Sequence, residues 1–145
     1  MASIAKIRTH YIYTLSGSIG IFYIGQTVDM KGRLWSHQSA ARNDMPEKVY
    51  HTIRALRHDF EMNIIDQITT AHDSLVLKLE ACWACEMNNR GCKLSNQWET
   101  GRCVDQHNPM KIAALVKQFA HAPKVELKRL AEMEREIAYA MVFEK

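Results

Sequence analysis

Long apolar runs are absent from this chain. No uninterrupted hydrophobic stretch among its 145 residues is long enough to span a membrane. The N-terminus also lacks the short apolar core of a signal peptide. We therefore expect a cytoplasmic protein with no secretion signal and no membrane partner.

A strong charge of one sign is also missing, because 19 basic and 16 acidic residues leave a net charge of only +3. That balance gives a weak general attraction to polyanions. The chain has no internal repeats and no low-complexity linker, and 47% of its residues are hydrophobic. A length of 145 residues with this composition predicts one globular domain with a sizeable core.

Cysteines are few, and their spacing favours packing over metal binding. Cys82 and Cys85 form a C-x-x-C pair, which Cys92, Cys103 and His107 follow. A structural zinc ion needs such pairs in turns, whereas this pair lies within a predicted helix. We expect reduced thiols packed in the interior, and a zinc-dependent adaptor is the alternative.

What the chain does contain is a pair of tyrosines, Tyr13 and Tyr23, in two β-branched and aromatic runs at 10–15 and 21–25. The small residues between these runs predict a β-hairpin. If the hairpin turns about Ser18, Tyr13 faces Tyr23, and a shift of two residues still leaves both phenols on one face. This face is either a packed pair of core tyrosines or part of a reactive site.

A helix is predicted after the hairpin, with Thr27 or Asp29 as its N-cap, because either side chain can accept hydrogen bonds from free backbone N–H groups. Arg33 and His37 are then one turn apart on the same helical face. Phenols, a guanidinium and an imidazole therefore come together on a short stretch of chain. This combination is suited to cleaving phosphate esters.

Three neighbouring residues have structural roles in this prediction. Leu34 and Trp35 flank the polar face and are expected to anchor the helix on the sheet. Gly32 costs about 1 kcal/mol relative to alanine inside a helix. Its presence indicates that another group approaches the helix closely there.

The fold class follows from the order of these patterns. We expect an α/β (α+β) fold, in which a small, mainly antiparallel three-stranded sheet is flanked by helices. Residues 1–103 form the main part, and residues 104–145 form a C-terminal helical extension that packs, dimerises or contacts DNA. The other predicted elements are a helix at 47–56, a strand at 60–68, and helices from Asp73 or Ser74, from Pro109, and from Pro123 to about residue 142.

Two glutamates on the apolar helix after residue 73 are candidate metal ligands. On a helical wheel Glu80 lies at the edge of the apolar stripe, and Glu86 lies near its middle. A carboxylate within an apolar face needs a partner or a metal ion. Two features favour Glu80: a tryptophan follows it in the sequence, and Glu80 lies at a suitable distance along the chain from Asn96. Glu86 remains the rival.

These residues resemble the signature of the GIY-YIG endonuclease family. The resemblance covers about residues 8–100. Tyr11 replaces the first glycine of the family pattern, and Gln26 stands where several members carry a lysine. The matching positions are Tyr11-Ile12-Tyr13, Tyr23-Ile24-Gly25, Arg33, His37, Glu80 and Asn96.

The resemblance implies a GIY-YIG nuclease-like fold and a metal-dependent DNA endonuclease, of a phage or mobile element, in a bacterial or phage-infected cell. One active site with one metal ion cuts one strand at a time. The protein would then be a nickase or a small homodimer that cuts both strands. The alternative is a catalytically silent DNA-binding or protein-interaction module that retains the fold.

The resemblance also implies roles for the individual residues. Glu80 is the expected sole protein ligand of one Mg²⁺ or Mn²⁺ ion per active site. Arg33 is expected to bind a non-bridging phosphate oxygen. Tyr13 is the favoured general base, Tyr23 would hold water or phosphate, and His37 is the alternative base or else a phosphate-binding or surface histidine. Asn96 is expected to brace a loop near the active site, and a direct contact to DNA is the alternative.

Basic residues gather in one part of the chain, where they form either a solvated face or a track for a DNA backbone. Histidines at positions 37, 51 and 58 lie among them. The expected DNA-binding residues are Lys31, Arg42, Lys48, Arg54 and Arg57.

Overall fold

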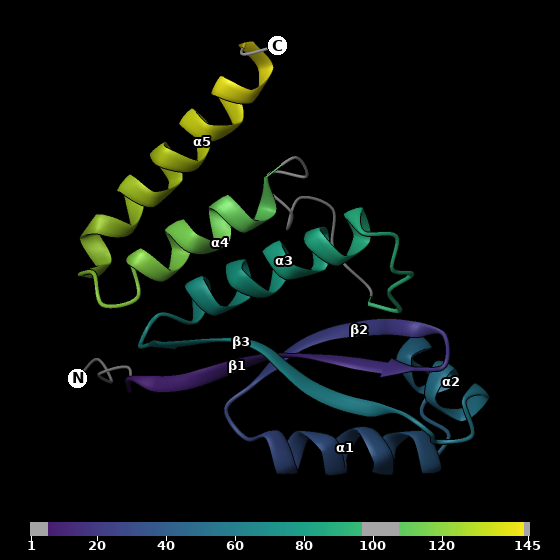
Figure 1. Cartoon of the computed structure of the whole chain (residues 1–145). Coiled ribbons are helices and arrows are strands. Elements are labelled where there is room, and N and C mark those ends of the chain that lie inside the picture. Colours follow the sequence, from purple (N-terminus) through teal and green to yellow (C-terminus); the bar gives the residue numbers. More distant parts are fainter. Residues whose placement is uncertain (1–5, 97–107, 144–145) are drawn as a thin grey trace.

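The computed structural model describes residues 6–96 and 108–143, with side chains as far as residue 137. An antiparallel sheet lies between two helical layers, and this confirms the expected mixed α+β class (Figure 1). Within the described residues, no helix combines the length and apolar character needed to cross a membrane. The elements are β1 (Arg8–Gly17), β2 (Gly20–Thr27), α1 (Met30–Arg42), α2 (Lys48–Ala55), β3 (Glu61–Thr70), α3 (Asp73–Asn89), α4 (Pro109–Gln118), the 3-10 turn η1 (Lys124–Glu126) and α5 (Leu127–Phe143).

The strand order is β2-β1-β3, so β1 is central and β2 forms an edge. The β1–β2 hairpin turns through residues 18–19, and its register is displaced by two residues from the expected one. Tyr13 therefore pairs with Gly25, and Tyr23 pairs with Leu15. Because side chains alternate along a strand, this shift keeps Tyr13 and Tyr23 on the same face, as expected.

The start of α1 depends on its N-cap. The carboxylate of Asp29 accepts a hydrogen bond of 3.1 Å from the backbone N–H of Gly32. A Cβ atom added at Gly32 would overlap this carboxylate, so the glycine makes room for the cap. The predicted close approach at Gly32 is thus confirmed. Thr27 instead stabilises the turn before α1 through the backbone of Asp29.

The expected anchoring of α1 by Trp35 is wrong, because that side chain is 64% exposed. The buried residues of α1 are His37 and Ala41. The helix therefore docks on the sheet through an imidazole, and the largest apolar side chain of the segment faces outward.

The opposite face of the sheet carries the main hydrophobic core. Here α3 and α4 pack side by side above the sheet (Figure 1). The residues of α4 share one core with those of α3 and the sheet, so the C-terminal extension packs on the main part of the chain. The central members of this core are Ile12, Ile24, Leu75, Leu79, Ile112 and Val116.

The last helix, α5, contacts this core through Leu130 and an ion pair. The carboxylate of Glu134 is 3% exposed and accepts a 2.9 Å hydrogen bond from Lys78 Nζ on α3. This pair joins the first half of α5 to α3.

The cysteines differ in their bonding state. Cys82 is a buried free thiol and Cys92 a half-buried one, as expected. Cys85 is disulfide-bonded, which corrects the expectation of a reduced thiol there. Cys103 and His107 lie outside the described residues.

Replacing Lys78 by methionine should lower the free energy of unfolding by about 2 to 3 kcal/mol, because the buried Glu134 carboxylate loses its partner. Chemical denaturation of both proteins measures the difference. The double variant Lys78→Met/Glu134→Leu should regain most of this stability, since both charges are replaced by apolar groups. Equal stability of Lys78→Met and wild type would contradict the packing of α5 through this pair.

Candidate active site

The hydroxyl of Tyr13 contacts two other predicted site residues, Arg33 and His37. The Nε–H group of Arg33 donates a 3.1 Å hydrogen bond to the Tyr13 oxygen. The same oxygen lies 2.7 Å from Nε2 of His37. Tyr13 comes from β1 and the other two residues from successive turns of α1, so the predicted one-turn spacing brings both side chains to a single phenol.

A glycine on the neighbouring strand makes room for this phenol. Tyr13 pairs with Gly25, and a Cβ atom added at Gly25 would overlap the Tyr13 ring. Any larger residue at position 25 would displace the ring from Arg33 and His37. The glycine of the Tyr23-Ile24-Gly25 motif therefore has a steric role at this site.

His37 is fully buried, so the interpretation of this residue as a surface or phosphate-binding histidine is wrong. Burial, helped by the charge of Arg33, lowers the pKa of His37 to about 4. The imidazole is therefore neutral at neutral pH. Its Nδ1 has no hydrogen-bond partner among the described residues, and its Nε2 is held by Tyr13.

Tyr13 is also fully buried, and this bears on its expected role as general base. Burial raises the pKa of its hydroxyl well above the ordinary range, although the hydrogen bond from Arg33 opposes the increase. A neutral phenol that accepts from Arg33 donates its own proton most readily to the neutral Nε2 of His37. In this arrangement Tyr13 positions the other two side chains. Burial makes its hydroxyl a weaker candidate for the general base, and that expected role stays a prediction.

Arg33 keeps its positive charge in this setting. Burial by itself lowers the pKa of the guanidinium, but the hydrogen bond to Tyr13 and the adjacent phenols outweigh burial and raise the pKa overall. A guanidinium that remains charged beside neutral aromatic groups is suited to binding an anion.

Two further tyrosines complete the cluster. The ring of Tyr23 lies 6.1 Å from that of Tyr13 and 5.4 Å from His37, measured between centroids. Tyr23 is only half-buried, so its phenol is the more accessible of the predicted pair. Tyr50 on α2 lies 6.0 Å from His37, and burial raises the pKa of its hydroxyl.

Tyr50 is the site residue that the sequence interpretation missed. The sequence did contain a signal for this residue. Tyr50 follows Val49 on a helix with a strongly apolar side, and that side packs against the cluster that contains Tyr13. The two clusters of buried residues divide the molecule at the sheet, and Tyr50 belongs to the cluster that contains Tyr13.

The two candidate glutamates have different surroundings. Glu80 is half-buried on α3, and its charge contributes to the raised pKa of Tyr13, so the carboxylate is close enough to act on that phenol. Glu86 forms an ion pair of 3.2 Å with Arg90, the residue at the C-cap of the same helix. This partner accounts for the Glu86 carboxylate without a metal ion.

The described residues contain no group of three or more histidines, cysteines, aspartates or glutamates that could hold a metal ion. Mg²⁺ is commonly held by one or two carboxylates, together with waters and substrate phosphates. One carboxylate near Arg33 and Tyr13 therefore fits such an ion when phosphate is also present.

Asn96 has a bracing role, but it braces the edge strand β2 and not the loop that was expected. Its Oδ1 accepts from the backbone N–H of Ile24 at 3.0 Å, and its Nδ2 donates to the carbonyl of the same residue. Ser95 adds two hydrogen bonds to the carbonyl of Phe22. The segment before residue 97 thus pairs with the free edge of β2 and fixes the strand that carries Tyr23.

The five expected DNA-binding residues do not form one set. Arg54 is bound internally, because its guanidinium donates to the carbonyls of Ala41 and Met45 and so joins α2 to the end of α1. These bonds give Arg54 a structural role, and its expected contact to DNA stays a prediction. The other four are exposed on α1, α2 and the turn after α2: Lys31, Arg42, Lys48 and Arg57.

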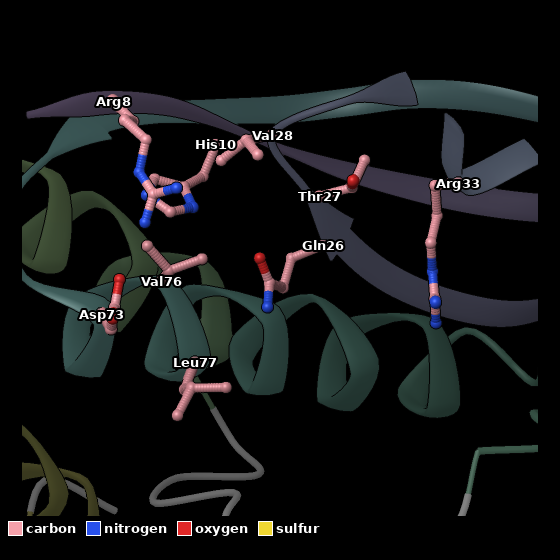
Figure 2. Close-up of a pocket in the computed structure, with 9 residues that line it drawn as sticks. All are labelled: Arg8, His10, Gln26, Thr27, Val28, Arg33, Asp73, Val76 and Leu77. Carbon is pink, nitrogen blue, oxygen red and sulfur yellow. The ribbon is translucent and has the colours of Figure 1, made fainter. Parts of the chain in front are cut away.

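A pocket of about 600 Å³ opens beside the cluster, and Arg33 forms part of its wall. Figure 2 shows the Arg33 side chain pointing toward α3, which forms the opposite wall through Val76 and Leu77. Glu80 follows Val76 by one helical turn, so it lies on the same face of α3.

Comparison of the chain with protein-family models, with curated proteins and with solved structures finds no match. The resemblance to the GIY-YIG endonucleases is carried by the site residues themselves and stays a prediction.

The low pKa of His37 makes stability depend on pH. An unfolded histidine has a pKa of about 6.5, so between that pH and the folded value of about 4 the unfolded state binds more protons. The stabilising contribution is complete above pH of about 6.5 and is lost as the pH falls toward 4. Wild type should lose on the order of 3 kcal/mol across this interval through His37 alone.

His37→Gln removes the titrating group and is the matched control. Urea denaturation at several pH values should give a flatter profile for this variant than for wild type. Parallel profiles for the two proteins would show that His37 is not buried in its neutral form.

Proposed function

We propose that this protein is a metal-dependent DNA endonuclease that hydrolyses phosphodiester bonds. One observation carries the proposal: a charged guanidinium, Arg33, is hydrogen-bonded to a buried phenol beside a second phenol and a carboxylate. Hydrolysis of a phosphodiester increases the negative charge on the phosphoryl oxygens in the transition state. A fixed cation in a partly buried site stabilises that charge more than it would in water.

The roles of the side chains follow from their burial. Arg33 binds a non-bridging oxygen of the scissile phosphate, since it remains charged and borders the open pocket. Tyr23 orients the attacking water, because its phenol is the accessible one. Tyr13 and His37 are positioning residues that act through Arg33 and the aromatic cluster.

Glu80 is the residue that would hold a Mg²⁺ or Mn²⁺ ion. When bound, such an ion supplies positive charge that stabilises the leaving oxygen. The fit depends on the Glu80 carboxylate, whose charge acts on Tyr13, and on the phosphate of the substrate as a further ligand. Glu86, which forms an ion pair with Arg90, is the rival ligand.

A single site of this kind cuts one strand in each event. A monomer would therefore nick duplex DNA, and a double-strand break would need two copies or two successive events. The exposed residues Lys31, Arg42, Lys48 and Arg57 are candidates for contacts to the DNA backbone on either side of the site.

The proposal predicts that purified protein with Mg²⁺ converts supercoiled plasmid to the nicked form, and that EDTA prevents this. Glu80→Gln keeps the size of the side chain but removes its charge, and Arg33→Lys keeps the charge but removes the planar fork. Each substitution should reduce the rate at least about 100-fold. Gel electrophoresis of plasmid over time measures the rates.

Glu86→Gln, on the same helix, is the matched control and should cut at close to the wild-type rate. Loss of activity in this variant with full activity in Glu80→Gln would move the metal site to Glu86. Binding of DNA without cleavage by wild type in Mg²⁺ or Mn²⁺ would support a catalytically silent DNA-binding module instead.

A further inference from the structure

The pocket beside Arg33 contains polar groups that the roles above do not use. Its wall includes Arg8 and His10 from β1, Gln26 from the end of β2, and Asp73 from the start of α3. Arg8 and His10 are two residues apart on a strand and so lie on the same face of the sheet. Figure 2 shows both side chains directed from β1 into the space in front of α3.

His10 is the most informative of these residues. Its side chain is only 5% exposed, and its Nδ1 has no hydrogen-bond partner among the described residues. A buried polar atom without a partner is costly, so native proteins rarely retain one without a reason. A ligand in the pocket would provide the missing hydrogen bond.

The charges around His10 identify the class of ligand. Arg8 is exposed and forms no ion pair within the described part of the chain, and Arg33 is also positively charged. Asp73 supplies one opposing carboxylate at the pocket rim, so the lining is positive overall. The guanidinium of Arg8 and the imidazole nitrogen of His10, beside the charge of Arg33, are donors that suit a phosphate group.

The position of the pocket relative to Arg33 indicates which phosphate of a nucleic acid strand would bind there. Arg33 belongs both to the pocket wall and to the cluster around the Tyr13 hydroxyl. Arg8 and His10 extend the donors away from that cluster along β1, beside the first half of α3. A nucleic acid strand whose scissile phosphate lies at Arg33 would place a neighbouring phosphate in this part of the pocket.

We propose that Arg8 and His10 form a subsite for a DNA backbone phosphate that neighbours the scissile one. The assignment to a phosphate next to the scissile one rests on the proposed nuclease function, whereas the ability of these residues to bind a phosphate does not. It gives the enzyme a second anchor point on the cut strand and so fixes the direction in which that strand crosses the site.

Binding can be measured without cleavage, by fluorescence anisotropy of a short fluorescein-labelled DNA duplex with Glu80→Gln protein as the parent. Adding Arg8→Gln should weaken binding about tenfold, the loss expected for one charge-assisted contact. It should also reduce the slope of log affinity against log salt concentration by about 1, because one phosphate contact is lost. Asp73→Asn should tighten binding, because it removes a repelling carboxylate from the rim.

Arg129→Gln on α5 is the matched control, since it removes an exposed arginine that is not part of the pocket lining. It should change neither affinity nor salt slope. His10→Gln tests the buried donor, with its thermal stability recorded alongside, and should weaken binding while the salt slope stays unchanged.

If the Arg8→Gln and Arg129→Gln proteins bind DNA with the same affinity and the same salt slope, the subsite is overturned, whether or not wild type nicks plasmid. A protein that never nicks plasmid but loses DNA affinity through Arg8→Gln would overturn the nuclease proposal and keep the phosphate subsite. The two proposals therefore fail separately.

Discussion

The arrangement of the site depends on one buried hydroxyl group. The Tyr13 oxygen accepts from Arg33 and contacts His37, and it does so where the chain excludes water. Hydrogen bonds in such surroundings are stronger than in water, and an unmade one is costly. The three side chains therefore hold each other in place. Gly25 permits this contact because no side chain at that position competes with the phenol ring.

The electrostatic state of the site follows from this contact. Burial keeps the phenol of Tyr13 and the imidazole of His37 neutral, whereas Arg33 retains its charge. The fixed cation of this cluster attracts an anion, and the nearby Glu80 carboxylate opposes that attraction unless a cation neutralises it. In the proposed function, the Glu80 carboxylate on α3 would hold the divalent cation.

The sequence predicted those parts of the structure that depend on local spacing. Alternation along a strand put Tyr13 and Tyr23 on one face even though the register differed by two residues. The spacing of Arg33 and His37 along a helix likewise brought both to the same phenol. These outcomes depend only on strand and helix periods, which the sequence displays directly.

The remaining features depend on contacts between distant segments, which local patterns do not specify. His37 is buried because α1 packs this residue against the sheet and α2. The sequence pattern alone suggested that the side of the helix carrying Trp35 would be the buried one. The internal role of Arg54 depends on how the chain turns between α1 and α2. Tyr50 enters the site for the same reason.

The most direct measurement of the central claim is the rate of plasmid nicking by Tyr13→Phe, compared with its thermal stability. The substitution removes one oxygen and keeps the ring over Gly25, so the fold should persist. We expect the nicking rate to fall about 100-fold or more, because Arg33 and His37 lose the group that positions them. Nicking at the wild-type rate by a folded Tyr13→Phe protein would contradict the account.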